Sequence, residues 1–227
     1  MRLRQHLGNR QHATRRDALL GEGRLSSVAS ACRKPLLDQR ALPARVEYLR
    51  YDCAATVAEG IKTMVVRGAP AIGCAAALGV ARGAVTSPAG DIEGLRDDLE
   101  AASARLARTR PTAVNLFWAL ERMRAEIAVA AAAPGASADD VRARVVSAAC
   151  KLVDEDVEIC RALGRAGLEL VPAQARILTH CNAGALATSG YGTALGVVRA
   201  AAEAGRNVRV FADETRPAFQ GARRRPR

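Results

Sequence analysis

The chain has 227 residues, 49% of them hydrophobic, and a formal net charge of +11. This length allows one large or two small globular domains with a real core. The charge lies at the ends: residues 1–34 carry +6 and the last five residues +4, which leaves +1 for residues 35–222. A near-neutral body with only seven aromatic residues argues against the basic face and stacking platform of a nucleic-acid-binding domain.

The six cysteines show no CxxC motif and no paired spacing, so the sequence predicts neither a zinc site nor a disulfide framework. Reduced thiols of a cytoplasmic protein fit best. The apolar stretches, such as residues 71–81, fall short of the ~20 residues that span a bilayer. We therefore expect a cytoplasmic protein with no membrane span.

The N-terminal part of the chain predicts helices after a short leader. Residues 1–34 lack sustained periodicity and are expected to form a poorly ordered leader. A short strand fits residues 46–49, and Asp52 is a candidate cap for a helix over residues 53–65. Pro70 suits the first turn of the next helix, residues 71–84, whose lack of a polar face indicates burial.

Three further helices follow in the sequence. Residues 91–108 and 112–131 are separated by "TRPTAVN", where Pro111 ends the first helix and Thr112 is a candidate cap for the second. Ser137 is a candidate cap for a long helix with two acidic residues in its first turn.

The pattern changes near residue 176. "RILTHCN" is typical of a strand, residues 183–205 of a helix that begins at glycine, and "VRVFAD" of a second strand, which together predict a βαβ unit. Parallel strands are normally buried on both faces and need neighbouring strands. We therefore expect an α/β protein with a mainly helical domain over residues 35–170 and an incomplete Rossmann-like domain over residues 171–227.

Cys181 is the strongest candidate for a reactive residue. The predicted strand ends beside it and the predicted helix begins just after it, which is where ligands bind in open α/β sheets. The helix start would lower the thiol pKa from its usual ~8.5. A buried core cysteine is an equally good interpretation of the position. His180 is expected to point away from Cys181, because successive strand residues face opposite sides.

Two other motifs are typical of phosphate sites. "VRGAPAIG" and "RPTAVN" each place an arginine beside the backbone amides of a predicted helix start, and both groups bind anions. The glycines of "GYGTALG" loosely resemble a dinucleotide-binding fingerprint, but they fall about two turns into the predicted helix and not at its start. Close packing is the better explanation of those glycines.

Taken in order, "LLDQRALP", "MVVRGAPAIG", "RPTAVNL", "ILTHCNAGALATSGYGTALGV" and "VFADETRPAFQGAR" closely resemble the methylthioribose-1-phosphate isomerase family of methionine salvage, from about residue 36 to residue 223. The regulatory subunits of translation initiation factor 2B and ribose-1,5-bisphosphate isomerase resemble the same family. The cysteine of "THCNAGALAT" is similar to the isomerase branch.

The resemblance implies an aldose–ketose isomerisation of S-methyl-5-thioribose 1-phosphate to the 1-phosphate of the ribulose, without a metal or an organic cofactor. It also implies a homodimer. It assigns catalysis to Cys181 and substrate binding to five residues: Arg67, Gly68, Ala69, Arg110 and Gln220.

The resemblance also implies a catalytic aspartate and an Asn-Lys pair in a later loop. Since the motifs stop at "QGAR", we expect a truncated or frameshifted member with little or no turnover. Three alternatives remain: a non-catalytic subunit that binds a sugar phosphate or nucleotide, as the resemblance to the regulatory subunits of translation initiation factor 2B implies, a ribose-1,5-bisphosphate isomerase, and a nucleic-acid-binding protein that uses its arginine-rich ends.

Overall fold

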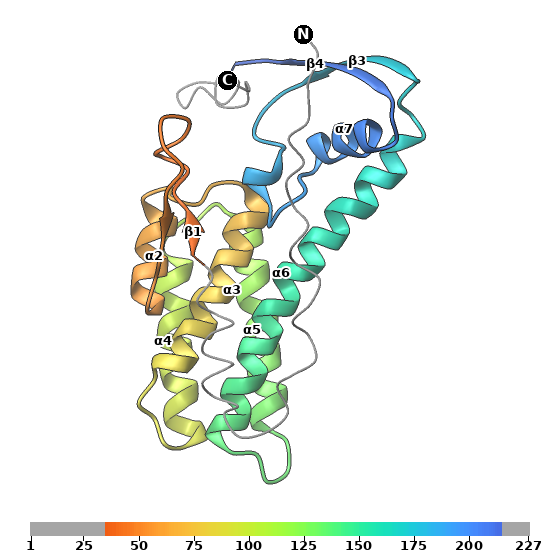
Figure 1. Cartoon of the computed structure of the whole chain (residues 1–227). Helices are drawn as coiled ribbons and strands as arrows, with labels where there is room; N and C mark the ends of the chain where they lie inside the picture. Colours follow the sequence, from red (N-terminus) through yellow and green to blue (C-terminus); the bar gives the residue numbers. More distant parts are fainter. Residues whose placement is uncertain (1–34, 215–227) are drawn as a thin grey trace.

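The computed structural model describes residues 35–214, which form a helical bundle followed by a small α/β unit (Figure 1). The elements in chain order are β1 (Leu36–Leu37), β2 (Tyr48–Leu49), α2 (Ala54–Lys62), α3 (Ala69–Thr86), α4 (Ile92–Ala107), α5 (Val114–Ala131), α6 (Ala138–Leu168), β3 (Gln174–Thr179), the 3-10 helix η1 (Ala185–Ala187), α7 (Ala194–Glu203) and β4 (Asn207–Ala212). The predicted leader, residues 1–34, lies outside the described residues.

Strands β1 and β2 form an antiparallel pair, with Leu36 opposite Leu49. Helix α2 follows, but its N-cap is Cys53 and not the predicted Asp52. The reason lies three residues on: the hydroxyl of Thr56 accepts a hydrogen bond from the Cys53 amide at 3.3 Å and contacts the Cys53 sulfur at 3.6 Å. This pairing closes a capping box that places the helix start one residue later than predicted.

Helix α3 is the centre of the bundle and packs against α2, α4, α5 and α6. Its burial confirms the prediction for the apolar segment with Pro70 in the first turn. By length and composition the helix could cross a membrane, but 72% of the relevant window is buried inside the protein. It is therefore the core helix of the bundle. Small side chains such as Ala76, Ala77 and Ala81 let the surrounding helices approach it closely.

Of the two caps predicted for the next helices, Ser137 is correct and Thr112 is wrong, and α4 has a further side-chain cap at Asp91. Asp91 accepts a hydrogen bond from the Gly94 amide at 2.8 Å at the start of α4. Ser137 and Asp140 form the capping box of α6. Helix α5 begins at Val114 after Ala113, without a side-chain cap, so the predicted role of Thr112 is wrong.

Arg142 of α6 closes the other end of α3. Its Nε atom donates to the Ala84 carbonyl at 3.1 Å, and Nη2 donates to the carbonyls of Ser87 and Ala89. Nη1 pairs with Asp139 at 2.8 Å. The last carbonyls of a helix have no intrahelical donor, so this nearly buried guanidinium satisfies groups that would otherwise lose their hydrogen bonds.

The α/β unit consists of β3, α7 and β4. The two strands pair in parallel, with Gln174 opposite Asn207 and Thr179 opposite Ala212. Val171, Ala175 and Ala201 form a small buried cluster between the strands and α7. The other side of the pair exposes the apolar side chains of Leu178 and Phe211, which lie opposite each other in the register.

The predicted helix over residues 183–205 is wrong in its first half. Residues 182–193 form a loop that contains only η1, and α7 begins at Ala194. Gly190 and Gly192 therefore lie before the helix and not two turns inside it. A Cβ atom on Gly192 would lie 2.8 Å from the Gly184 backbone, so close packing does require glycine here.

Helix α6 belongs to both units, as Figure 1 shows. Its first half packs against α3 and α5, and its second half packs against α7. Gly164 and Gly167 permit that second contact, since a Cβ on Gly167 would lie 2.5 Å from a methyl group of Val197. The relation between bundle and α/β unit is thus fixed by one continuous helix.

Candidate functional site

The N-terminus of α3 has no side-chain cap. Gly68 is its N-cap, and the first-turn amides of a helix have no intrahelical acceptor. Pro70 lies in the first turn of the helix, where its missing amide hydrogen costs no intrahelical hydrogen bond. The backbone amides and the helix dipole therefore leave a positive end beside the guanidinium of Arg67.

Gly68 is required by two features of its position. Its φ of 106° is a conformation that side chains rarely adopt, and a Cβ there would lie 2.3 Å from the Cα of Ala187. The start of α3 thus touches η1, which begins four residues beyond Cys181 in sequence. Two segments 119 residues apart, Gly68 and Ala187, meet at one point.

The "RPTAVN" segment reaches the same end of α3 through a second close contact. A Cβ on Gly73 would lie 2.8 Å from the carbonyl oxygen of Asn115, so α5 begins against the first turns of α3. Arg110 lies just before this contact. Its Nη1 atom is buried and has no hydrogen-bond partner among residues 35–214. A buried guanidinium donor without an acceptor is a group whose hydrogen bond an anion could complete.

Cys181 lies two residues beyond the end of β3 and is exposed. Its φ of 62° is in the left-handed region, which is uncommon for a residue with a side chain. The helix that was predicted to begin beside it starts only at Ala194. The predicted helix start beside Cys181 is therefore wrong, and so is the alternative of a buried core cysteine.

The carboxyl ends of both strands carry further polar residues. His180 Nδ1 lies 3.5 Å from a carboxylate oxygen of Asp213, and the Asp213 amide donates to the Thr179 carbonyl at 3.1 Å. Neither His180 nor Asp213 is buried, so this pair sits at the open edge beside Cys181. Gln220, the last predicted substrate contact, lies outside the described residues.

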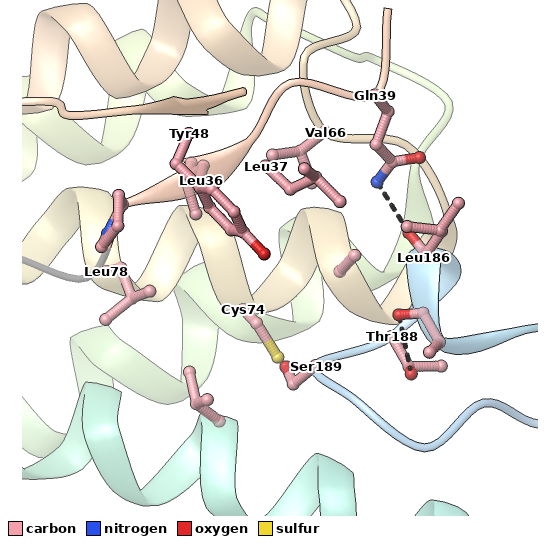
Figure 2. A pocket seen from close by; sticks show the side chains of 14 residues that line it. Leu36, Leu37, Gln39, Tyr48, Val66, Cys74, Leu78, Leu186, Thr188 and Ser189 are labelled. Carbon is pink, nitrogen blue, oxygen red and sulfur yellow. Dashed lines mark hydrogen bonds between the residues drawn. The ribbon is translucent and has the colours of Figure 1, made fainter. Parts of the chain in front are cut away.

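Two residues that the sequence did not single out anchor the 182–193 loop. The Nε2 atom of Gln39, from "LLDQ", donates to the Leu186 carbonyl at 2.7 Å (Figure 2). Asp156 of α6 accepts a hydrogen bond from the Ser189 amide at 2.6 Å. Gln39 had a signal, because it belongs to a quoted motif, whereas Asp156 lies in an acidic stretch that reads as an exposed helix face.

A cavity of about 240 Å³ opens between the β1–β2 pair, α3 and the 182–193 loop, and Figure 2 shows its lining. The lining is mostly apolar, with Leu36, Tyr48, Val66 and Leu186 among its side chains. Cys74 lies at its floor, and burial raises the pKa of this thiol to about 11 although it hydrogen-bonds to Ser189. Cys74 is therefore a neutral thiol near pH 7 and not a nucleophile.

Comparison with known proteins gives the same relatives for sequence and structure. The Initiation factor 2 subunit family matches residues 65–225. Methylthioribose-1-phosphate isomerase from Geobacter metallireducens is 54% identical over 188 residues, which is 83% of this chain and 54% of that protein. The corresponding protein from Desulforamulus reducens is 53% identical over the same shares.

Two solved structures share the fold. The 5-methylthioribose 1-phosphate isomerase from Pyrococcus horikoshii OT3 gives a TM-score of 0.78 at 44% identity and covers 84% of this chain and 52% of that one. The translation initiation factor eIF-2B delta subunit from A. fulgidus gives 0.75 at 43% identity, with 84% and 54% covered. The chain thus spans about half the length of the relatives that it matches.

Proposed function

Since this chain belongs to the Initiation factor 2 subunit family, we propose that it carries the phosphate-binding and cysteine side of a site for aldose–ketose isomerisation of S-methyl-5-thioribose 1-phosphate, a step of methionine salvage. The observation that supports this most is the meeting of the α3 N-terminus with the segment that follows Cys181, at the Gly68–Ala187 contact. The substrate in this proposal is the one that the names of the relatives give.

In this proposal the phosphate binds at the positive end of α3. The amides beside Gly68 and Ala69 donate to phosphate oxygens, and Arg67 and Arg110 supply guanidinium donors. The buried, unpartnered Nη1 atom of Arg110 supports this role, because an anion would provide the missing acceptor.

The reaction opens the sugar ring and moves one hydrogen from C2 to C1, so that C2 becomes a carbonyl carbon and the phosphate stays on C1. Cys181 is the proposed catalytic residue on this chain. Its exposed position at the carboxyl end of β3 is where reacting atoms lie in open α/β sheets. Gln220 is proposed to contact the substrate as well.

We further propose that the chain divides near residue 170 into a helical and a Rossmann-like unit, that it forms a homodimer and that it is cytoplasmic. Both relatives with solved structures share the described fold.

A second candidate is a non-catalytic subunit that binds a sugar phosphate or a nucleotide. The similarity to the eIF-2B delta subunit supports it, since its TM-score is close to that of the isomerase. The two candidates differ at Cys181. Binding without turnover, unchanged by Cys181→Ser, favours the subunit, whereas turnover that is lost in Cys181→Ser favours the isomerase.

The test combines calorimetric binding of methylthioribose 1-phosphate with an NMR assay for the ketose. Arg110→Ala is expected to weaken binding by about tenfold or more, as for loss of a charge-assisted hydrogen bond. Arg108→Ala is the matched control, because this exposed arginine is two residues away and changes the charge equally. Equal affinities of both variants and wild type would remove Arg110 from the site.

A third function is nucleic-acid binding through the arginine-rich ends. The salt dependence of the affinity distinguishes it from the other two. Binding to phosphates of a nucleic acid falls steeply with salt and would disappear with residues 1–34 and 223–227. Retention of nucleic-acid affinity after their removal would count against that function.

A further inference from the structure

The loop that joins β3 to α7 directly follows Cys181, the proposed catalytic residue, and has little regular structure of its own. It begins beside Cys181, contains η1 and touches Gly68 through Ala187. Most of its backbone hydrogen bonds are local; for example, the amides of Thr193 and Leu195 both donate to the Ala183 carbonyl at 3.1 Å. The position of Cys181 relative to α3 therefore depends on contacts that the loop makes with other elements.

Asp156 makes the strongest of these contacts from α6. Its carboxylate accepts the Ser189 amide at 2.6 Å, a charge-assisted hydrogen bond to a group 33 residues away in sequence. The same carboxylate lies close enough to the thiols of Cys74 and Cys160 to raise the pKa of each, although burial is the larger cause for both. Asp156 thus reaches inward beneath the loop and is not part of a solvated face.

The loop next to Ser189 is stiffened internally. The hydroxyl oxygen of Thr188 accepts hydrogen bonds from the amides of Gly190 at 3.2 Å and Gly192 at 3.1 Å. These two hydrogen bonds join Thr188, Gly190 and Gly192 into one local turn. A tether on the Ser189 amide therefore restrains the whole segment from Thr188 to Gly192.

We propose that Asp156 is a positioning residue that holds the 182–193 loop on α6 and so sets where Cys181 stands relative to the start of α3. The catalytic consequence of this inference rests on the proposed function, in which Cys181 faces a substrate bound at the start of α3. This role does not require Asp156 to contact either Cys181 or the substrate. Its action depends on the hydrogen bond to Ser189, which asparagine can also accept through its amide oxygen.

The variants Asp156→Ala, Asp156→Asn and Asp154→Ala separate this role from a general effect of charge or helix stability. Asp154 is exposed on the same helix and serves as the control for loss of one carboxylate. Hydrogen exchange of a peptide over residues 182–193, read by mass spectrometry, reports the tether. Alkylation of Cys181, resolved from the other thiols by peptide mapping, reports its position.

Asp156→Ala is expected to accelerate exchange at Ser189 by about tenfold or more and to change the alkylation rate of Cys181. Asp156→Asn is expected to restore both rates to within about twofold of wild type, and Asp154→Ala to leave both unchanged. Wild-type rates in Asp156→Ala would overturn the proposal. So would failure of asparagine to restore them, because the role would then lie in the charge alone.

If Asp156→Ala does not fold, Asp156→Glu decides, since it keeps the charge but moves the carboxylate by one methylene; an unchanged Cys181 rate in that variant would overturn the proposal. Neither measurement needs substrate. A wild-type chain without turnover or ligand binding would therefore count against the proposed function while the exchange data still decide the role of Asp156. Where wild type turns over, Asp156→Ala is expected to lower kcat more than it raises KM.

Discussion

Gln39 and Leu186 lie 147 residues apart in the chain, and the Nε2 atom of the first lies 2.7 Å from the carbonyl oxygen of the second. The Gln39 amide also donates to the Val65 carbonyl at 3.0 Å. One nearly buried glutamine therefore connects the "LLDQ" segment, the bend before Arg67 and the loop after Cys181.

Replacing Gln39 by alanine is expected to lower the free energy of unfolding by about 1–3 kcal/mol, because the Leu186 carbonyl would lose its donor in a partly buried place. Exchange in residues 182–193 should rise with it. Denaturant unfolding and hydrogen exchange check both effects. Gln174→Ala, at the exposed start of β3, should leave both unchanged; equal effects of the two substitutions would show that the contact is not responsible.

Gly68→Ala is expected to be among the most damaging substitutions in the protein. It forces a side chain into a φ of 106° and against the Ala187 Cα, which its Cβ would approach to 2.3 Å. The matched control is Gly135→Ala, which has a φ of 71° but nothing within 4 Å of the new Cβ.

The control should cost about 1 kcal/mol for the left-handed conformation alone. Gly68→Ala should cost clearly more and should abolish sugar-phosphate binding. Thermal unfolding and calorimetry measure the two properties, and a cost for Gly68→Ala no larger than that of the control would contradict the close contact.

Arg142→Met is expected to destabilise the protein by about 3 kcal/mol, since it leaves the carbonyls at the end of α3 without donors. Arg144→Met removes the same charge two residues away, from a side chain that is 54% exposed and pairs with Glu126 on the surface. That variant should change stability by less than about 1 kcal/mol. Urea denaturation of both variants provides the comparison, and similar midpoints would contradict a stabilising role for the hydrogen bonds from Arg142 to the end of α3.

The raised pKa of Cys74 predicts how stability depends on pH. Its pKa goes from 9.0 to about 11 in the folded protein, mainly because burial disfavours the thiolate. Between these values the unfolded thiol has lost its proton and the folded thiol keeps it. The contribution of Cys74 to stability is therefore fully present below pH 9 and is lost as pH rises from about 9 to about 11.

The slope expected from this one group approaches about 1.4 kcal/mol per pH unit inside that window. Denaturant unfolding at several pH values measures it, and Cys74→Ala should show a smaller fall than wild type over the same range. A parallel pH dependence of the two proteins would mean that the Cys74 pKa is not raised. Cys74 should also be alkylated much more slowly at pH 8 than the exposed Cys181.

The helices could be predicted from sequence wherever local signals decide their ends. Ser137 with Asp140 three residues later marks the start of α6, and the apolar run after Pro70 marks α3. The start of α2 was misplaced by one residue, because Cys53 is an unusual cap and its partner Thr56 gives no strong signal.

The segment from Ala183 to Thr193 could not be predicted, because its shape is decided elsewhere. Its composition allows a helix, but Gln39 and Asp156 form hydrogen bonds with its backbone groups. In addition, Gly192 packs on Gly184. These contacts override local propensity. The same reason explains the wrong environment predicted for Cys181, which was placed at a helix start that lies thirteen residues further on. The motifs around Arg67 and Arg110 were correctly predicted to lie at helix starts, but their approach through Gly73 and Asn115 appears only in three dimensions.

Helix α6 runs unbroken for 31 residues, about 46 Å at 1.5 Å per residue. It carries Arg142 near one end, Asp156 past its middle and the glycines that seat α7 near the other. A continuous helix transmits rotation and translation along its length and offers no hinge between the bundle and the strands. The contacts that seat α6 on α3 and those that seat α7 on α6 therefore lie on one helix, so a substitution that tilts α6 on the bundle should also displace α7 and the two strands.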